Sequence, residues 1–127
     1  MAMTVTAAEA ARHLRSRAAE RARVAAQRAA RLMGLVPLAA ELLRNRYGAR
    51  EVVLFGSLAT GSFTELSDVD LAVRGIDAAD YFAALADLMA LFGGPVDLVR
   101  LEQAPASLGH RIAAEGRPAK IAADDTA

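Results

Sequence analysis

The sequence predicts an α/β (α+β) domain, in which helices pack on a small mixed sheet of three to four strands after a long N-terminal helix. Residues 7–33 contain no Gly or Pro and are rich in Ala, Arg and Glu, which are good helix formers. The short apolar runs that follow are separated by Gly-containing connections and are typical of strands. Apolar residues make up 54% of the 127 residues, which is enough to build the core of one domain.

The long N-terminal helix has a start signal and an apolar stripe. Thr6 is expected to cap its first turn, with Glu9 three residues later as in a capping box. Small or apolar residues then recur at spacings of three and four, which predicts one narrow face, made of Ala11, Leu14, Ala18, Ala22, Ala25, Ala29 and Leu32. This face is expected either to pack on the chain's own core or to serve self-association or partner docking.

Gly34 and Pro37 are expected to end the first helix, and residues 37–47 to form a second one. The later elements are predicted in chain order as a strand at 51–55, a connection at 56–67 with room for one helical turn, a strand at 68–74, a helix at 78–92, a strand at 96–101 and a helix at 106–114. The chain then divides into a long Ala/Arg-rich helix at 1–34, a compact domain at 35–118 and a flexible tail at 119–127.

Three acids in the predicted strands are candidates for a metal site. Asp68 and Asp70 are two residues apart, so their carboxylates point to the same face of a strand. Such close carboxylates repel each other unless a cation compensates them, and Mg²⁺ prefers hard oxygen ligands. Asp97 lies in the third strand and completes a three-carboxylate cluster if that strand neighbours the second. The alternative is an acidic strand start that faces solvent.

Gly56 and Ser57 directly follow the first predicted strand. A glycine lets the backbone approach a ligand closely. If a turn of helix starts here, the Ser57 hydroxyl and the following amides could hold phosphate oxygens. The alternative is that Ser57 is a plain turn residue or helix cap. The run lacks the Gly-Lys-Ser/Thr of a Walker A loop.

The run from Gly56 to Asp70 resembles the signature of the polymerase-beta-like nucleotidyltransferase superfamily. It reads Gly-Ser, ten residues, then Asp-x-Asp, and an apolar strand precedes it. The small size is similar to that of minimal nucleotidyltransferases (MNT), which are the antitoxins of HEPN/MNT toxin–antitoxin pairs. The resemblance covers about residues 35–118 and implies the nucleotidyltransferase fold.

By this resemblance, Asp68 and Asp70 would ligate Mg²⁺, with two metal sites possible. Asp97 would share the second metal or accept the proton of the attacking hydroxyl, and Gly56 and Ser57 would contact the triphosphate. The resemblance implies transfer of a nucleoside monophosphate, AMP from ATP or the equivalent from another nucleoside triphosphate, to a hydroxyl. The acceptor would be a tyrosine of a HEPN-type toxin, so the reaction would be an AMPylation that neutralises the toxin.

The sequence departs from the family pattern in two ways. Many relatives carry a basic residue just before the second glycine of the motif, where this chain has Thr60, so one phosphate contact is missing. Larger relatives have a second domain for the acceptor, which is here expected on a separate protein. A rival interpretation is a catalytically weak or inactive module that neutralises its partner by binding alone, and a further one is a nucleic-acid-associated accessory protein.

The net charge of zero hides two charged parts of the chain. Residues 1–50 carry ten Arg against three Glu, a balance of +7, whereas residues 51–127 carry five Lys or Arg against twelve Asp or Glu, a balance of −7. The basic helix could therefore meet an acidic partner. No aromatic residue lies among its arginines, so we do not expect it to bind nucleic acid.

The remaining features narrow the class of protein. The chain has no cysteine, which excludes disulfides and thiolate metal sites and fits a cytoplasmic protein. No stretch of 18 apolar residues occurs, so no membrane span is expected. His13 and His110 are isolated in the sequence and are not expected to be ligands. Arg100 should point to the opposite face of its strand from Asp97, which keeps it outside the candidate site.

Overall fold

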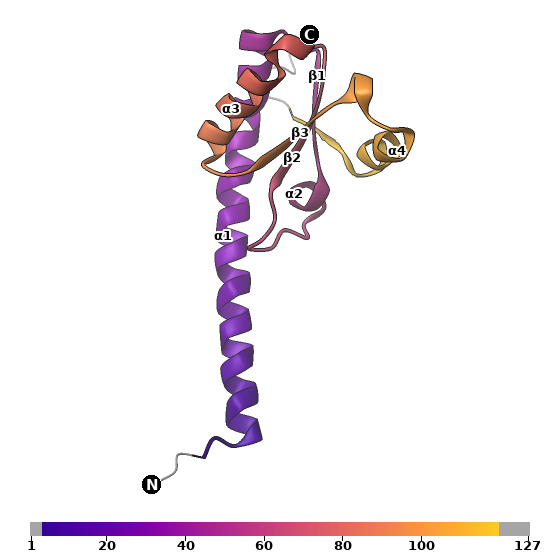
Figure 1. Ribbon diagram of the computed structural model, residues 1–127. Helices are drawn as coiled ribbons and strands as arrows, with labels where there is room; N and C mark the ends of the chain where they lie inside the picture. Colours follow the sequence, from indigo (N-terminus) through magenta and orange to yellow (C-terminus); the bar gives the residue numbers. More distant parts are fainter. Residues whose placement is uncertain (1–3, 120–127) are drawn as a thin grey trace.

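The computed structural model describes residues 4–119, which form a four-stranded sheet with helices on both faces and one long projecting helix (Figure 1). The helices are α1 (Ala7–Tyr47), α2 (Gly56–Thr60), α3 (Tyr81–Phe92) and α4 (Ala106–Glu115), and the strands are β1 (Glu51–Phe55), β2 (Val69–Arg74), β3 (Val96–Arg100) and β4 (Arg117–Pro118). Two short 3₁₀ turns, Ala78–Asp80 and Leu101–Gln103, complete the elements. The predicted fold class is confirmed.

The prediction of two N-terminal helices is wrong, because α1 runs without a break through Gly34 and Pro37. A proline inside a helix costs about 3 kcal/mol and a glycine about 1 kcal/mol. Residues on both sides of this pair are buried on one face of α1, namely Leu32, Val36, Ala39, Ala40 and Leu43. Burying one leucine or valine side chain is worth about 1.5–3 kcal/mol, so packing on the sheet outweighs the local preference.

The two ends of α1 are capped as expected. The Thr6 hydroxyl accepts a hydrogen bond from the Glu9 amide at 3.0 Å, which confirms the predicted N-cap. Gly48 takes a left-handed conformation, with φ of 75°, and its amide donates to the carbonyl of Arg44. This ending turns the chain directly into β1.

The sheet has the order β3-β2-β1-β4. Strand β1 pairs antiparallel with β2 and with β4, whereas β2 pairs in parallel with β3. The parallel pair requires a crossover connection, which α3 supplies. The strand β4 was not predicted from the sequence, because it is only two residues long and contains Pro118.

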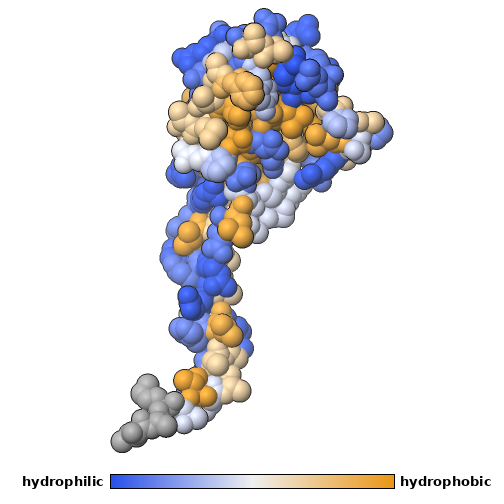
Figure 2. Space-filling model, in the orientation of Figure 1, coloured by the Kyte–Doolittle hydropathy of each residue, from blue (hydrophilic) through white to orange (hydrophobic). Residues whose placement is uncertain are grey.

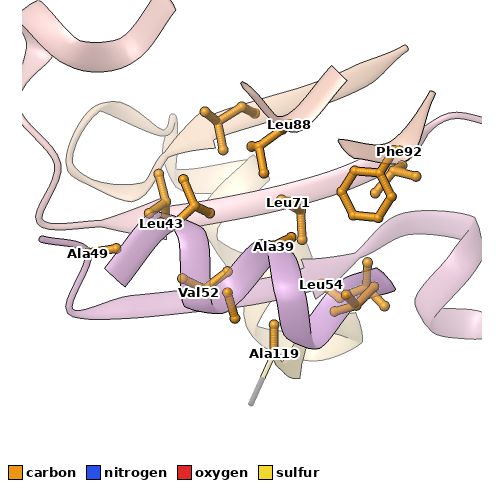
Figure 3. Packing of buried hydrophobic residues seen from close by; sticks show 14 of the residues in the cluster. Ala39, Leu43, Ala49, Val52, Leu54, Leu71, Leu88, Phe92 and Ala119 are labelled. Atoms are coloured by element: carbon orange, nitrogen blue, oxygen red, sulfur yellow. The ribbon is translucent and has the colours of Figure 1, made fainter. Parts of the chain in front are cut away.

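The two faces of the sheet bury different side chains. Helices α1 and α3 cover one face, where Leu43, Leu71 and Leu88 pack together (Figure 3). Helix α4 covers the other face, where Ile112 packs with Phe55 and Ala72. This division matters for the site, because alternate residues of each strand point to opposite faces.

The C-terminal end of the described chain belongs to the packed domain. Ala119, at which the predicted tail begins, is buried at 2% exposure, and its amide donates to the Val52 carbonyl at 2.9 Å. The rest of the predicted tail, residues 120–127, lies outside the described residues.

The N-terminal part of α1 extends beyond the domain as a narrow stem (Figures 1 and 2). Ala25 is the first buried residue of the helix. Before it, Leu14 and Val24 are 64% and 47% exposed. The predicted stripe therefore divides in two, because its later members, Ala25, Ala29 and Leu32, pack on this domain while its earlier members do not. Among residues 4–119, no helix combines the length and the apolar character needed to cross a membrane.

Candidate functional site

The strand register brings two of the predicted acids together. Asp70 and Asp97 are paired positions on the neighbouring parallel strands β2 and β3, and such strands lie about 4.8 Å apart. Two residues further along these strands, Ala72 and Val99 belong to the apolar cluster under α4. Asp70 and Asp97 therefore point to the α4 face of the sheet. From the sequence, Asp97 joins the other acids only if its strand lies next to the second predicted strand, and this is the case.

Asp68 lies in the connection just before β2 and is exposed. Its negative charge contributes to the environment of Asp70, so the structure brings the three predicted acids into one electrostatic group. Asp97 is also exposed, whereas Asp70 is half-buried. Asp70 therefore forms the inner part of the group, and the other two acids lie at its solvent side.

Gly56 and Ser57 begin α2 beside these acids. The last residue of β1, Phe55, pairs with Asp70, so Gly56 follows directly at the edge of the site. Gly56 is buried, and its φ of 72° is a conformation that favours glycine. Ser57 is half-buried, and its carbonyl accepts the amides of Gly61 and Ser62, which closes the turn after α2.

The pKa of Asp70 is raised from 3.8 to about 6. Burial of the carboxyl is the largest cause, and the negative charge of Asp97 is the next. Asp68 and Glu115 raise the pKa further, whereas the positive charge of Arg111 lowers it. A carboxylate that is desolvated among like charges favours the approach of a cation or a proton.

The connection between α2 and β2 is held by the long helix α1. The Arg28 guanidinium donates to the Ser67 carbonyl at 3.0 Å, and its Cζ atom lies 5.0 Å from the centre of the Phe63 ring. Arg21 also pairs with Glu65, with 3.7 Å between Nε and Oε1. Arg28 thus holds the residue directly before Asp68, and Arg21 pairs with another residue of the same connection.

The donor set fits Mg²⁺ by its chemistry. Asp68, Asp70 and Asp97 offer only carboxylate oxygens, and the pKa of Asp70 is raised first by burial and then by the negative charge of Asp97. Within residues 4–119, no group of three or more His, Cys, Asp or Glu side chains lies close enough together to enclose a cation by itself. Mg²⁺ is commonly bound by one or two carboxylates together with water and substrate phosphates, so two carboxylates suffice for the protein part of such a site.

Sequence reasoning missed two residues of this site, Arg111 and Glu115, which α4 brings to Asp70. They are four residues apart on α4 and form an ion pair, with 3.2 Å between Nε and Oε2. No sequence pattern indicated which face of the sheet α4 covers. Arg100 lies outside the site as expected, with its guanidinium donating to the Ile76 carbonyl at 3.3 Å.

The family model described as Polymerase beta, Nucleotidyltransferase matches residues 39–120, which is more than half of the chain. The chain therefore belongs to the polymerase beta nucleotidyltransferase family. The match includes Gly56, Ser57 and the three acids, and it confirms the resemblance inferred from the Gly-Ser and Asp-x-Asp signature.

A stretch of 62 residues is 37% identical to a protein of Methanocaldococcus jannaschii named "Putative protein adenylyltransferase". The similarity covers 46% of this chain and 63% of that protein. The chain thus spans less than two thirds of the length of this relative.

Solved structures show the same fold. A structure described as a "putative minimal nucleotidyltransferase" has a TM-score of 0.63 at 30% identity and covers 71% of this chain and 94% of its own. A toxin–antitoxin crystal structure with AMP-PNP has a TM-score of 0.58 at 27% identity, and the match covers 68% of this chain and 73% of that chain. A third structure is the complex of a tri-AMPylated Shewanella oneidensis HEPN toxin with an MNT antitoxin. It has a TM-score of 0.56 at 24% identity, and the match covers 73% of this chain and 76% of that chain. At this identity the likeness is one of fold alone.

Proposed function

We propose that this chain is a Mg²⁺-dependent protein adenylyltransferase that transfers AMP from ATP to a hydroxyl of a HEPN-type toxin and thereby acts as its antitoxin. The observation that carries the proposal is the pairing of Asp70 with Asp97 beside the start of α2. This arrangement puts hard oxygen ligands next to backbone and hydroxyl groups that suit phosphate. Membership of the nucleotidyltransferase family supports the reaction class.

Each residue of the site has a proposed role that follows from its position. Asp70 and Asp68 would hold Mg²⁺, which when bound would stabilise charge on the attacking and leaving oxygens of an in-line displacement. Gly56 and Ser57 would orient the triphosphate, because the backbone at Gly56 carries no side chain that would keep phosphate away. Asp97 is exposed, so an incoming hydroxyl could reach it. As general base, Asp97 would contribute a rate factor of about 10²–10⁴.

The proposed acceptor lies on another protein. A toxin–antitoxin structure of the same fold, at 27% identity, contains AMP-PNP, which supports a nucleotide substrate and a toxin partner. The adenylyltransferase name of the archaeal relative supports transfer of AMP. The exposed acids Asp68 and Asp97 leave the solvent side of the site accessible to such a partner.

A second candidate function is neutralisation by binding alone, without transfer. The exposed stem of α1 favours it, because an unburied helix carrying Leu14 and Val24 gives a binding surface that is independent of the acids. In this alternative the site would be a remnant, and the partner would be held by the stem.

The decisive experiment measures label transfer. The protein is incubated with Mg²⁺, ATP labelled at the α-phosphate and the protein product of the adjacent gene. We expect label on that product, and we expect it to vanish in the double variant Asp68→Asn/Asp70→Asn. Asp77→Asn is a matched control, because it removes an exposed acid between β2 and α3 and should leave transfer unchanged.

The two candidate functions give opposite results. If the wild type labels no acceptor and the double variant still binds and neutralises the toxin, the chain acts by binding alone. Transfer that survives in the double variant would place the metal ligands elsewhere.

A further inference from the structure

The candidate site has a charge problem that its predicted residues do not solve. Asp68, Asp70 and Asp97 are all negative, and a nucleoside triphosphate adds several further negative charges. Helix α2, where the phosphates would lie, contains no basic residue. Its last residue is Thr60, whose hydroxyl donates a hydrogen bond to the Gly56 carbonyl at 3.2 Å. Mg²⁺ would compensate part of this negative charge, and any cationic side chain that binds the phosphates directly has to come from another element.

Helix α4 is the element placed to supply it. Ile112 anchors α4 on the sheet against Phe55, the residue immediately before Gly56. One flank of the helix, with Gly109 and Ala113, lines a hollow shared with Glu51 and Arg74 at the far ends of β1 and β2. With 100° between successive helical residues, Arg111 and Glu115 fall on the opposite flank, away from this hollow. Helix α4 also contacts α2.

The electrostatic environment of Asp70 agrees with this placement. Arg111 and Glu115 both act on that carboxyl, as two residues one helical turn apart on the facing flank should. Arg111 directly precedes Ile112 in α4, and Ile112 packs on Phe55, which pairs with Asp70 in the sheet. The Arg111 side chain is 55% exposed and is paired with Glu115, so its guanidinium can exchange this carboxylate for a phosphate without leaving a buried partner.

We infer that Arg111 binds the triphosphate of the nucleotide and is the cationic phosphate ligand of this site. The inference rests on the proposed function and adds a residue to it. A guanidinium suits this role because its fork of N–H donors matches phosphate oxygens and it stays charged at all working pH values. Glu115 then acts as the resting partner that holds Arg111 in place until the nucleotide arrives.

The test measures nucleotide binding without catalysis. Binding of the α,β-methylene analogue of ATP in Mg²⁺ is followed by calorimetry for the wild type, Arg111→Ala and Arg111→Lys, and the same series is repeated with AMP. We expect Arg111→Ala to weaken binding of the analogue roughly tenfold or more, since charge-assisted hydrogen bonds are lost. Arg111→Lys should retain part of the affinity, and AMP binding should change little.

The matched control is Arg74→Ala. Arg74 forms the same kind of exposed ion pair, with 3.1 Å between its Nε and Glu51 Oε1, at the opposite end of β2. Its removal should leave binding unchanged, and thermal unfolding of each variant confirms that it folds. If the wild type binds the analogue and Arg111→Ala binds it equally well, or if AMP loses as much affinity as the analogue, the inference is wrong while the proposed function stands. A wild type that binds no nucleotide would instead overturn the proposed function.

Discussion

A Cβ atom added at Gly56 would lie 2.1 Å from Oδ2 of Asp70. The backbone at the start of α2 and the carboxylate of β2 are thus in direct contact, with no room for a methyl group between them. Gly56 also has a φ of 72°, which L side chains rarely adopt. The glycine of the signature therefore has a structural role toward Asp70 in addition to any contact with a ligand.

We expect Gly56→Ala to displace the Asp70 carboxylate and to lower the stability of the fold. The left-handed conformation alone costs about 1–2 kcal/mol for a residue with a Cβ atom, and the steric clash adds to it. Urea unfolding measures the loss of stability. Nucleotide-analogue binding in Mg²⁺ should be lost in the same variant, because the proposed metal ligand Asp70 is moved.

Gly61→Ala separates these two effects. Gly61 has a similar φ of 81°, but nothing lies within 4 Å of an added Cβ atom. This variant should lose a similar conformational contribution to stability and keep its nucleotide binding. Equal losses of binding in the two variants would show that the contact between Gly56 and Asp70 is unimportant.

Because the pKa of Asp70 is raised, ionisation of this carboxyl should lower the free energy of unfolding of the protein without Mg²⁺. The carboxyl is protonated in both folded and unfolded chains below about pH 4, and its contribution to stability is lost as the pH rises toward 6. With the partial exposure of the side chain taken into account, the free energy of unfolding should fall by about 1–2 kcal/mol relative to Asp70→Asn across this window. Urea unfolding in EDTA at pH 3.5 and 7.5 measures this difference.

Asp87 gives a control of opposite sign. Hydrogen bonds from Tyr47 and Arg46 lower its pKa, so its contribution to stability is present at neutral pH and is lost as the solution becomes more acidic. Asp87→Asn should therefore be less stable than the wild type at pH 7.5, and the difference should disappear in acid. A constant difference between wild type and Asp70→Asn over the whole pH range would contradict the assigned environment of Asp70.

Added Mg²⁺ should restore the stability that is lost when Asp70 ionises. A ligand that binds only the folded chain stabilises it in proportion to its occupancy. At pH 7.5, Mg²⁺ is expected to raise the unfolding midpoint of the wild type and to leave Asp70→Asn nearly unchanged. A comparable rise in both proteins would mean that the cation binds elsewhere.

Local sequence pattern was sufficient for β1 and for the spacing of the site acids, because alternation and motif spacing are local properties. It could not decide that Asp70 and Asp97 are in register, since strand neighbours depend on the path of α3 across the sheet. It missed Arg111 and Glu115 for a similar reason, because the face that α4 covers is set by packing of Ile112. The helix break expected at Pro37 was overruled by burial of residues on both sides of it.

The continuous α1 predicts that Pro37 carries a cost. Proline has no amide hydrogen, so the carbonyl of Met33 lacks its helical partner. Pro37→Ala should therefore raise the free energy of unfolding by about 1–3 kcal/mol, as measured by urea unfolding. Gly34→Ala is the matched control, because nothing lies within 4 Å of an added Cβ atom there. Its free energy of unfolding should rise by about 0.5–1 kcal/mol. A less stable Pro37→Ala would show that packing of α1 on the sheet requires the shape of the proline.

The stem of α1 should contribute to assembly and not to the stability of the domain. Ala25 is the first buried residue of the helix, and Arg21 is the first of its residues paired with the domain, through Glu65. Removal of residues 1–20 should therefore change the free energy of unfolding by less than about 0.5 kcal/mol and should leave nucleotide binding intact. Binding to the proposed toxin partner or self-association, measured by light scattering of the mixed and single proteins, should weaken.

A full-length variant distinguishes loss of the apolar contacts from loss of helix length. Leu14→Glu/Val24→Glu keeps the stem and removes its exposed apolar side chains, which are the contacts that a partner would bury. This double variant should weaken assembly as much as the truncation does, because burial of apolar surface is the main source of affinity at such a helix. Assembly that survives the double variant but not the truncation would assign the binding to the arginines of the stem, and that binding should then weaken with added salt. Unchanged assembly in both would remove the stem from the interface.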